Sequence, residues 1–178
     1  GNKWFSVIDK ISTDRTLQLA WEKVRRNAGA CGVDGITIGR FEQNSQSRLL
    51  AVKEHLDKGT YQPKPVKRVW IDKPGSAEKR PLGIPTVTDR VVQAAVRMVI
   101  EPIFENRFAK HSYGFRPRCG CKDALRRVEE LLHAGHAHVV DVDIKGYFDA
   151  IPHDRLMALV RERIADGRVL GLIEGFLK

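Results

Sequence analysis

Two carboxylates stand inside an otherwise apolar, β-branched run, VVDVDIKGYFD at residues 139–149. The run predicts a central strand over 139–144, and strand alternation places Asp141 and Asp143 on one face of it. Because a central strand is buried on both faces, each carboxylate would cost several kcal/mol unless a positive charge compensates it. The source of that compensating charge is the first question that the sequence raises.

Asp143 lies where the predicted strand ends and a Lys-Gly turn begins. A carboxylate in this place is suited to hold a hard cation such as Mg²⁺, which prefers one or two carboxylates together with substrate phosphates. In the competing interpretation, Asp143 caps the turn or pairs with a neighbouring Lys or Arg, and the residue types leave both open. For Asp141, a structural role such as turn capping or ion pairing is favoured over metal binding.

Phe148 follows Asp143 by five residues. Gly146 between them allows the backbone to turn, so the ring could close over whatever the metal holds. An aromatic residue is more often part of a core, and periodicity alone does not decide between the two interpretations.

Basic residues are concentrated in the segment from Lys64 to Pro85, which predicts a β-hairpin with the polar tip DKPGSAE. Six cations fall within 17 residues: Lys64, Lys67, Arg68, Lys73, Lys79 and Arg80. Such a run is usually a solvated face. On a hairpin that also carries Trp70, it is equally the composition expected of a finger that binds phosphates.

Aromatic and guanidinium side chains alternate in SYGFRPR, where Tyr113, Phe115, Arg116 and Arg118 stand close together. This combination stacks on bases and binds nucleic-acid backbones. Packing of the two aromatic rings in a core is the competing account, and both roles can coexist.

Neither the histidines nor the cysteines predict a metal site. The histidines at 133, 136 and 138 straddle Gly135 at a helix end without regular ligand spacing, so we interpret them as surface or capping residues. The three cysteines, at 31, 119 and 121, are too few for a disulfide framework and match no common zinc signature. They predict a reducing compartment.

The chain is basic, with 31 Lys and Arg against 22 Asp and Glu and a formal net charge of +9 over 178 residues. Its surface should attract polyanions, nucleic acid first among them, although solubility alone is the plainer alternative. No apolar stretch is long enough to span a bilayer and no signal-peptide core is seen. We therefore expect no membrane partner and a location in the bacterial cytoplasm or its organellar equivalent.

Apolar periodicity predicts helices over 17–28, 41–56, 91–103, 124–132, 156–164 and about 167–176. The first two are joined by the turn GACGVDG, and Gly135 is a candidate cap for the fourth. One strong strand late in the chain needs partners to make a sheet, and we expect these partners beyond Lys178.

Several segments together resemble the reverse transcriptase encoded by group II introns. They are GVDGIT, GTYQPKPVKRVWIDKPGSAEKRPLGIPTVTDRVVQ, EPIFENRF, SYGFRPR and VVDVDIKGYFDAIPHDRL, in this order and at this spacing. The likeness runs from about Thr16 to Lys178. A match of many segments is far more specific than any short motif.

The resemblance implies an α+β fold, the fingers and the first part of the palm of a right-hand polymerase, with a basic β-hairpin and a central palm strand. Residues 1–118 resemble the fingers, 119–150 the first part of the palm, and 151–178 a helical return towards the fingers. Members of the family synthesise DNA on an RNA template, and full-length members also bind intron RNA and help it to splice.

The resemblance also assigns roles to single residues. Asp143 matches the first catalytic aspartate, a ligand of two Mg²⁺ ions, and Ile144 matches the residue whose backbone carbonyl joins the shell of one metal. Phe148 matches the steric gate against a ribose 2′-hydroxyl. Lys73 and Arg80 match the residues that hold the incoming triphosphate.

Nucleic-acid contacts are expected at Lys64, Lys67 and Arg68, and at Arg116, which falls in a family motif near the template. The implied partners are an RNA template, a DNA primer, a deoxynucleoside triphosphate and the intron RNA. Self-association through apolar surface is a further expectation.

The sequence departs from the family in two places. CGCKDAL stands where members commonly carry a Gly-Arg-Ser-Ala-type stretch, which puts a template contact from that loop in doubt. The second carboxylate motif, an aromatic-Ala-Asp-Asp turn, is not found in the 178 residues, nor are the rest of the palm, the thumb and the maturase region. Because one aspartate cannot hold two Mg²⁺ ions, we expect this chain alone not to polymerise.

Two alternatives accompany this interpretation. The chain could be a catalytically inactive RNA-binding remnant that docks on structured intron RNA. It could also come from the reverse transcriptase of a retron, a diversity-generating element or a CRISPR-associated system, although GVDG and PKPVKRVWIDKP favour the intron family.

Overall fold

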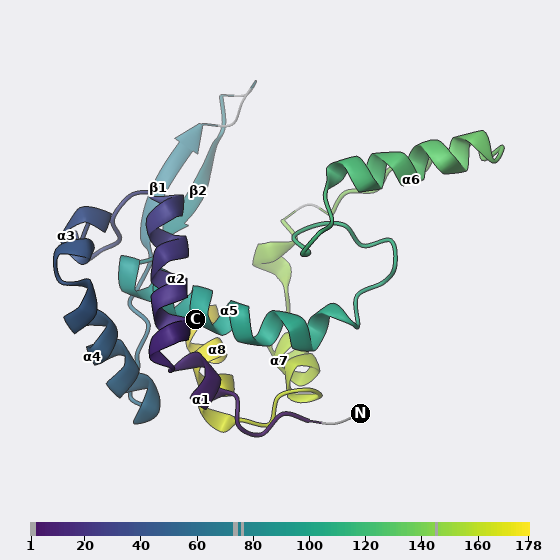
Figure 1. Cartoon of the computed structure of the whole chain (residues 1–178). Coiled ribbons are helices and arrows are strands. Elements are labelled where there is room, and N and C mark those ends of the chain that lie inside the picture. Colours follow the sequence, from purple (N-terminus) through teal and green to yellow (C-terminus); the bar gives the residue numbers. More distant parts are fainter. Residues whose placement is uncertain (1–2, 73–74, 76, 145) are drawn as a thin grey trace. The chain divides into compact units, whose positions relative to one another are not determined.

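The computed structural model describes residues 3–72, 75, 77–144 and 146–178 (Figure 1). The chain divides into two compact units, residues 1–101 together with 153–178, and residues 102–152. The described part is rich in helix and contains a small antiparallel sheet of two strands, as expected. No helix in that part is both long and apolar enough to cross a membrane.

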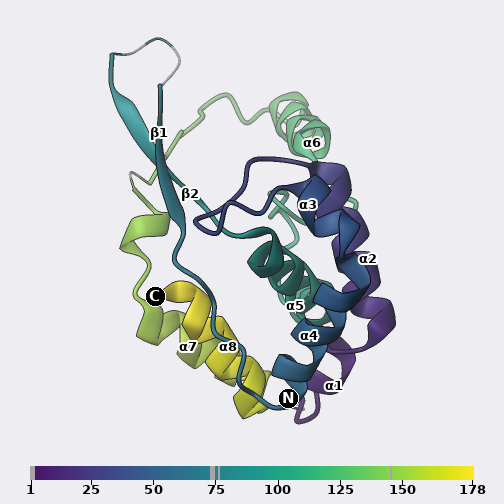
Figure 2. The ribbon, with the colours of Figure 1, turned by 90° about the vertical axis from the view of Figure 1, so that its left-hand side faces the viewer.

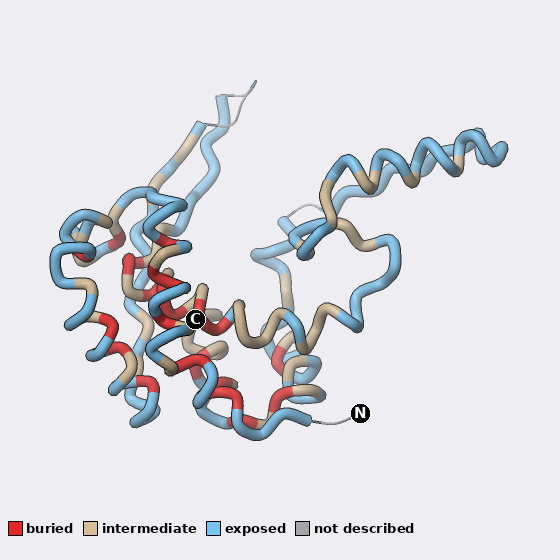
Figure 3. The backbone as a smooth tube through the Cα atoms, in the orientation of Figure 1, coloured by how far each residue is buried: buried red, intermediate tan, exposed pale blue. Residues whose placement is uncertain are grey.

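Helices make up most of the first unit. They are α1 Ile8–Ile11, α2 Asp14–Asn27, α3 Ile38–Gln43, α4 Ser45–Asp57, α7 His153–Arg161 and α8 Gly167–Leu177, with most of α5 Val87–Glu105. The helices predicted over 17–28, 91–103, 156–164 and 167–176 are thereby confirmed. Buried positions recur along α2, α4 and α5 (Figure 3). Within this core the rings of Trp21 and Phe41 lie 4.5 Å apart.

The helix predicted over 41–56 is two helices in the structure. Asn44 lies between α3 and α4 with φ −128° and ψ 28°, outside the helical region. An Asn side chain can bond to nearby backbone and so favours helix boundaries over helix interiors. The apolar spacing continues across the break, which is why periodicity did not reveal it.

Backbone hydrogen bonds join the N-terminal segment of the first unit to the residues between α7 and α8. The N–H of Trp4 donates to the carbonyl of Arg163 at 2.8 Å, and the N–H of Ala165 donates to the carbonyl of Trp4 at 2.9 Å. These bonds form an isolated parallel bridge between Trp4 and Ile164. The segment before α1 is therefore fixed against the turn between α7 and α8.

Asp166 strengthens this junction because its buried carboxylate serves both helices. Oδ2 accepts from the backbone N–H groups of Val7 and Ile8, both at 2.9 Å, where α1 begins. Oδ1 accepts from the N–H groups of Arg168 and Val169, at 3.1 and 3.4 Å, in the first turn of α8. Burial opposes ionisation of Asp166, but the four donors outweigh it and lower the pKa of the carboxyl.

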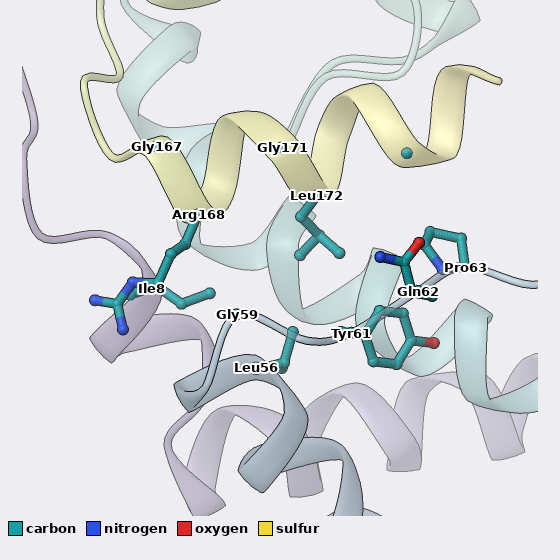
Figure 4. A pocket seen from close by; sticks show the side chains of 11 residues that line it. Ile8, Leu56, Gly59, Tyr61, Gln62, Pro63, Gly167, Arg168, Gly171 and Leu172 are labelled. Carbon is teal, nitrogen blue, oxygen red and sulfur yellow. The ribbon is translucent and has the colours of Figure 1, made fainter.

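Helix α8 also lies close to the extended segment 59–63, which leads to the hairpin (Figure 4). A side chain in place of Gly175 would bring its Cβ to 3.2 Å from Cγ of Pro63, so Pro63 would have to move by a few tenths of an ångström to accommodate it. A cavity of about 350 Å³ remains between the two elements, with Tyr61 on one side and Leu172 on the other. The C-terminal helix thus supports the chain immediately before the first strand.

The predicted basic hairpin is confirmed. Strand β1 Lys67–Asp72 pairs antiparallel with β2 Lys79–Ile84, with Lys67 opposite Ile84 and Asp72 opposite Lys79. Figure 2 shows the hairpin projecting beyond the helices of its unit. The central part of the predicted polar tip, including Lys73, lies outside the described residues.

A buried carboxylate fixes the base of this hairpin. Asp89, in the first turn of α5, is 2 % exposed and accepts from the hydroxyls of Thr86 at 2.6 Å and Tyr61 at 2.7 Å. The N–H of Lys64 approaches both of its oxygens at 3.4 Å. Burial, together with the hydrogen bond and charge of Asp89, raises the pKa of Tyr61. Asp89 thereby joins the segment before β1 to the helix after β2.

We expect Asp89→Asn to lower the free energy of unfolding by about 2–4 kcal/mol. An amide has one acceptor oxygen, so its NH₂ would face donor groups that now meet a carboxylate. Tyr61→Phe, which removes one of these bonds, should cost only about 0.5–1.5 kcal/mol. Urea unfolding followed by the fluorescence of buried Trp21 measures both, and an Asp89→Asn variant as stable as wild type would contradict the prediction.

The second unit contains α6 Cys121–His133 and a 3₁₀ turn, η1 Phe148–Ala150. The predicted helix over 124–132 is confirmed, and Gly135 ends it with φ +93°. The N–H of His136 donates to the carbonyl of Leu131 at 3.1 Å, and the N–H of Gly135 to that of Leu132 at 3.0 Å, a Schellman motif. No residue of α6 is buried within its unit.

The strand predicted over 139–144 is wrong for this structure. Residues 136–144 form no regular element, and Val140 and Val142 are 87 % and 78 % exposed. The β-branched residues favour an extended backbone, but a strand needs hydrogen bonds to a neighbour, and no described residue pairs with this segment. The two carboxylates within it are consequently not buried.

Candidate active site

The acidic segment presents its carboxylates to solvent. Asp141 and Asp143 are both exposed, and neither has a hydrogen-bond or ion-pair partner among the described residues. The desolvation cost expected for a buried strand is therefore not incurred. The turn-cap and ion-pair interpretations of Asp143 have no support in the described part of the chain. Among the described residues, none occupies the carboxylate of Asp143, which is open to a ligand.

The donor chemistry of this segment fits part of a Mg²⁺ site. The carboxylate of Asp143 and the backbone carbonyl of Ile144 are hard oxygen donors, the type that Mg²⁺ prefers. In the ranges that the structure covers, no three His, Cys, Asp or Glu side chains are grouped closely enough to hold a metal ion. These residues would thus provide some of the ligands of a metal and not a complete cage.

Phe148 lies just beyond this segment, in the turn η1. Gly146 has φ +64°, as the predicted turn requires, and the N–H of Ala150 donates to its carbonyl at 3.1 Å. Phe148 is 77 % exposed, and its ring meets that of Tyr147 edge-on at 5.5 Å. The interpretation of Phe148 as a core residue is therefore wrong within this unit, and the ring is free to contact a ligand.

The hairpin register divides the predicted cations between two faces. Directly opposed residues of an antiparallel pair share a face, so Lys67 and Arg80 lie on the face of Val69 and Ile71. Along the strands their positions are four residues apart, about 13 Å. Neither has an ion-pair partner among the described residues. This face therefore carries two cationic groups that have no ion-pair partner among the described residues.

The opposite face carries Arg68, Trp70 and Lys79. Lys79 lies 3.7 Å from the carboxylate of Asp72, which partly neutralises it. Trp70 is 57 % exposed. Arg68 and Trp70 together offer a cation and an aromatic surface, but on the other side of the sheet from Arg80.

Lys64 precedes the hairpin, and its side chain forms an ion pair with a residue outside the hairpin. Its Nζ lies 3.8 Å from Oδ2 of Asp34, a side chain that is only 10 % exposed. Asp34 also accepts from the N–H of Ile36 at 3.1 Å, while the N–H of Gly35 donates to the carbonyl of Gly32 at 3.3 Å and closes the turn in GVDG. Lys64 therefore has a structural ion pair in addition to any contact with a nucleic acid.

Arg116 is engaged inside its own unit. Its Nε and Nη2 donate to Oε1 of Glu105 at 3.0 and 2.8 Å, and its Nη1 donates to the carbonyls of Ala109 and Ser112 at 3.0 and 2.7 Å. The hydrogen bond to Glu105 raises its pKa. The guanidinium also lies 5.3 Å from the ring centre of Phe108. Arg116 thus holds the loop that carries the SYGFRPR motif.

That loop presents Phe115 to solvent. The side chain is 90 % exposed, and the backbone has φ +56°, a conformation that non-glycine residues seldom adopt. Arg118 has a similar φ of +60°.

The cysteines at 31, 119 and 121 are all free, as expected.

The predicted site residues fall in different units. Asp143, Ile144, Phe148 and Arg116 belong to residues 102–152, whereas Lys64, Lys67, Arg68 and Arg80 belong to the first unit. Lys73 lies outside the described residues. Within each unit the structure supports local groups, the acidic segment with Phe148 in one and the cationic hairpin face in the other.

Sequence reasoning missed a further cationic group on α2 and α5. Lys23 and Asn27 are four residues apart on α2, and Arg90, Gln93 and Arg97 follow helical spacing on α5. This spacing is a detectable signal for a polar stripe on each helix. That the two stripes line one groove depends on the fold, which periodicity does not supply.

The chain was compared with known protein families and curated proteins. The family model described as reverse transcriptase (RNA-dependent DNA polymerase) matches residues 71–177, more than half of the chain. This range includes the end of β1, the hairpin cations Lys73, Lys79 and Arg80, the SYGFRPR loop and the acidic segment.

Several relatives are proteins of introns. The group II intron-encoded protein LtrA of Lactococcus lactis subsp. cremoris is 39 % identical over 160 residues, which are 90 % of this chain and 26 % of that protein. Protein YkfC of Escherichia coli is 39 % identical over 152 residues, 83 % of this chain and 40 % of that protein. Nuclear intron maturase 1 of Arabidopsis thaliana mitochondria is 35 % identical over 94 residues, 53 % of this chain and 13 % of that protein.

The chain spans about a quarter of the length of LtrA and two fifths of YkfC. The predicted resemblance to the enzymes of group II introns is confirmed by these matches, which cover most of the chain. The chain belongs to the reverse transcriptase (RNA-dependent DNA polymerase) family.

Proposed function

We propose that this chain is part of an RNA-directed DNA polymerase of a group II intron. The observation that carries the proposal is the acidic segment, where Asp143 is exposed and unpaired among the described residues and is followed in the sequence by Ile144 and by the exposed Phe148. The family match includes this segment. Residues 1–118 would form the fingers, 119–150 the first part of the palm, and 151–178 a helical return towards the fingers.

In this proposal each residue of the acidic segment has a defined task. Asp143 and the carbonyl of Ile144 hold Mg²⁺, together with ligands that the described residues do not provide. When bound, two such ions supply activation of the primer 3′-hydroxyl and stabilisation of the leaving pyrophosphate. Phe148 occupies the space that a ribose 2′-hydroxyl would need and so selects deoxynucleotides.

The hairpin supplies positive charge. Arg80, with Lys73, neutralises the triphosphate as its charge shifts during transfer. Lys67, Arg68 and Lys64 contact the nucleic-acid backbone, and Arg116 acts by holding the loop near the template. The proposed partners are accordingly an RNA template, a DNA primer, deoxynucleoside triphosphates and the intron RNA.

The test is primer extension on an RNA template with Mg²⁺, using the complete intron-encoded protein. Synthesis that requires both the metal and Asp143 supports the proposal, and synthesis that persists without either one overturns it. The 178-residue chain alone should not extend a primer, because its sequence holds no Ala-Asp-Asp motif to complete a two-metal site.

RNA binding without synthesis is the second candidate function. The cationic face of the hairpin favours it, because Lys67 and Arg80 are open to an anionic ligand in the chain as it stands. The two candidate functions predict different results for a substitution at Asp143. In a polymerase it abolishes DNA synthesis, whereas in a protein that only binds RNA there is no synthesis to lose and RNA affinity is unchanged.

For the hairpin we expect Lys67→Gln and Arg68→Gln each to reduce the slope of log affinity against log salt by about 0.7 to 0.9, because each removes one phosphate contact. Fluorescence anisotropy of a labelled RNA at several salt concentrations measures the slope. Lys58→Gln removes the same charge from a residue paired with Glu54 on α4 and should leave the slope nearly unchanged. Equal effects of all three variants would show that only net charge matters.

A further inference from the structure

A groove in the first unit lies between α2 and α5, apart from the residues proposed for catalysis. Its volume is about 250 Å³. The side chains that line it are Lys23, Val24, Asn27, Arg90, Gln93, Ala94 and Arg97. Three of these are cations, two are amides and none is acidic.

The cations of this groove are incompletely neutralised. Lys23 is exposed and has no ion-pair partner among the described residues. Arg97 donates through Nε and Nη2 to Oε1 of Glu101, at 3.0 and 2.7 Å, and Glu101 does not line the groove. The carboxylate of Glu101 therefore offsets the charge of Arg97 and leaves that of Lys23 facing the groove.

Arg90 supplies the most informative contact. Its Nη1 and Nη2 donate to the backbone carbonyls of Ala28 at 2.8 Å and Ala30 at 2.9 Å, just after α2 ends. These partners are neutral, and its Nε is buried with no partner in the described structure. Burial lowers the pKa of Arg90, as expected for a partly desolvated cation that no carboxylate compensates.

The loop contacts of Arg90 also fix the shape of the groove. Gly29 between the two carbonyls has φ +103°, and a Cβ at this position would lie 3.0 Å from Nη1 of Arg90. A left-handed glycine and a close guanidinium thus hold the charge of Arg90 in one place. The positive charge is organised by the fold before any ligand arrives, which lowers the ordering cost of binding.

We propose that this groove binds a phosphodiester group of RNA, with Lys23 as the direct ionic contact, Gln93 and Asn27 as amide donors, and Arg90 as a fixed charge behind them. Lys, Arg and amide side chains are the groups that contact nucleic-acid phosphates. The inference rests on the proposed RNA-binding function and adds a second contact region to the hairpin. An acidic protein segment is the competing ligand.

The first test measures RNA binding by the chain. Lys23→Gln should reduce the slope of log affinity against log salt by about 0.7 to 0.9, and Lys23→Glu should weaken binding further. Arg15→Gln, with the same charge change two turns earlier on α2 and outside the groove, should keep the wild-type slope. An unchanged slope in both Lys23 variants would overturn the proposal. Arg90 is left intact because its loss would also release the loop.

The second test identifies the ligand directly. The side-chain amide of Gln93, followed by ¹H–¹⁵N NMR, should shift on titration with a short RNA and, more weakly, with inorganic phosphate. A shift with phosphate but none with RNA would show a small-anion site and overturn the RNA assignment. A shift with an acidic peptide alone would do the same in favour of a protein partner.

These results separate the groove from the catalytic proposal. RNA binding that depends on Lys23 in a protein whose DNA synthesis ignores Asp143 would support the groove and overturn the polymerase assignment. DNA synthesis that depends on Asp143, together with RNA binding that does not change when Lys23 is substituted, would support the polymerase assignment and overturn the groove proposal.

Discussion

Asp143→Asn is expected to reduce templated DNA synthesis by the complete intron-encoded protein by about a thousandfold or more, while RNA affinity stays nearly unchanged. An amide keeps the size of the side chain but removes the negative charge that, in the proposed function, would hold Mg²⁺. Because Asp143 is exposed and has no partner among the described residues, the substitution should not disturb folding. The loss is therefore expected in the rate of synthesis and not in the amount of folded protein.

Asp141→Asn provides the matched control, since Asp141 lies two residues away in the same exposed segment. It should retain most of the activity, because the proposal gives Asp141 no metal ion to hold; the structural role expected for Asp141 has no support either, since no described residue contacts its carboxylate. Rates are measured by primer extension over a range of Mg²⁺ concentrations, and RNA affinity by anisotropy. Equal losses of activity in both variants would indicate that Asp141 and Asp143 bind the metal together. Full activity of Asp143→Asn would show that Asp143 is not a metal ligand.

Local features of the fold were predictable because their causes lie within a few residues. Thr13 caps α2 by accepting from the N–H of Thr16, and Gly135 ends α6 with a left-handed backbone. The basic hairpin follows from β-branched residues on either side of a polar tip. In each case the residues that decide the structure are neighbours in the sequence.

The strand over 139–144 was not predictable in the same way. Its β-branched composition favours an extended backbone, but strand formation depends on a partner elsewhere. Asp143 is exposed and not buried in a strand, so its carboxylate does not need a compensating positive charge for the reason that the sequence suggested. The same residue emerges as a ligand candidate for the opposite reason, since its charge is exposed and unneutralised by any described residue.

The arrangement of the candidate sites also depends on distant contacts. The hairpin register, not the density of charge, places Lys67 with Arg80 and separates both from Arg68. The hydrogen bonds of Arg90 join residues 60 and 62 positions apart, and those of Asp166 reach residues 158 and 159 positions away. No periodicity or motif within the sequence encodes such pairings.

Asp166→Ala is expected to lower the free energy of unfolding by about 3–5 kcal/mol, the largest stability effect that we predict. The substitution leaves four backbone N–H groups without their acceptor, two at α1 and two at α8. Both helices would lose their N-terminal contact at once, and the two ends of the unit would separate more easily. Urea unfolding followed by Trp21 fluorescence measures the loss.

Asp154→Ala is the control for Asp166→Ala, because Asp154 is an exposed acid in the first turn of α7. It should cost no more than about 1 kcal/mol, through its interaction with the helix dipole. A similar cost for both substitutions would show that the carboxylate of Asp166 acts only as a general charge and not as a shared cap.

The pH dependence of stability gives an independent check on Asp166. Its pKa is lowered in the folded state, so the folded protein releases this proton more readily than the unfolded chain does. The stabilisation is therefore fully present above the unfolded-state value of about 3.9 and is lost as the pH falls through the lower folded-state value. The stability difference between wild type and Asp166→Asn should be constant above about pH 5 and should shrink below about pH 4. A difference that stays constant down to about pH 2 would mean that the hydrogen bonds to Asp166 do not depend on its charge.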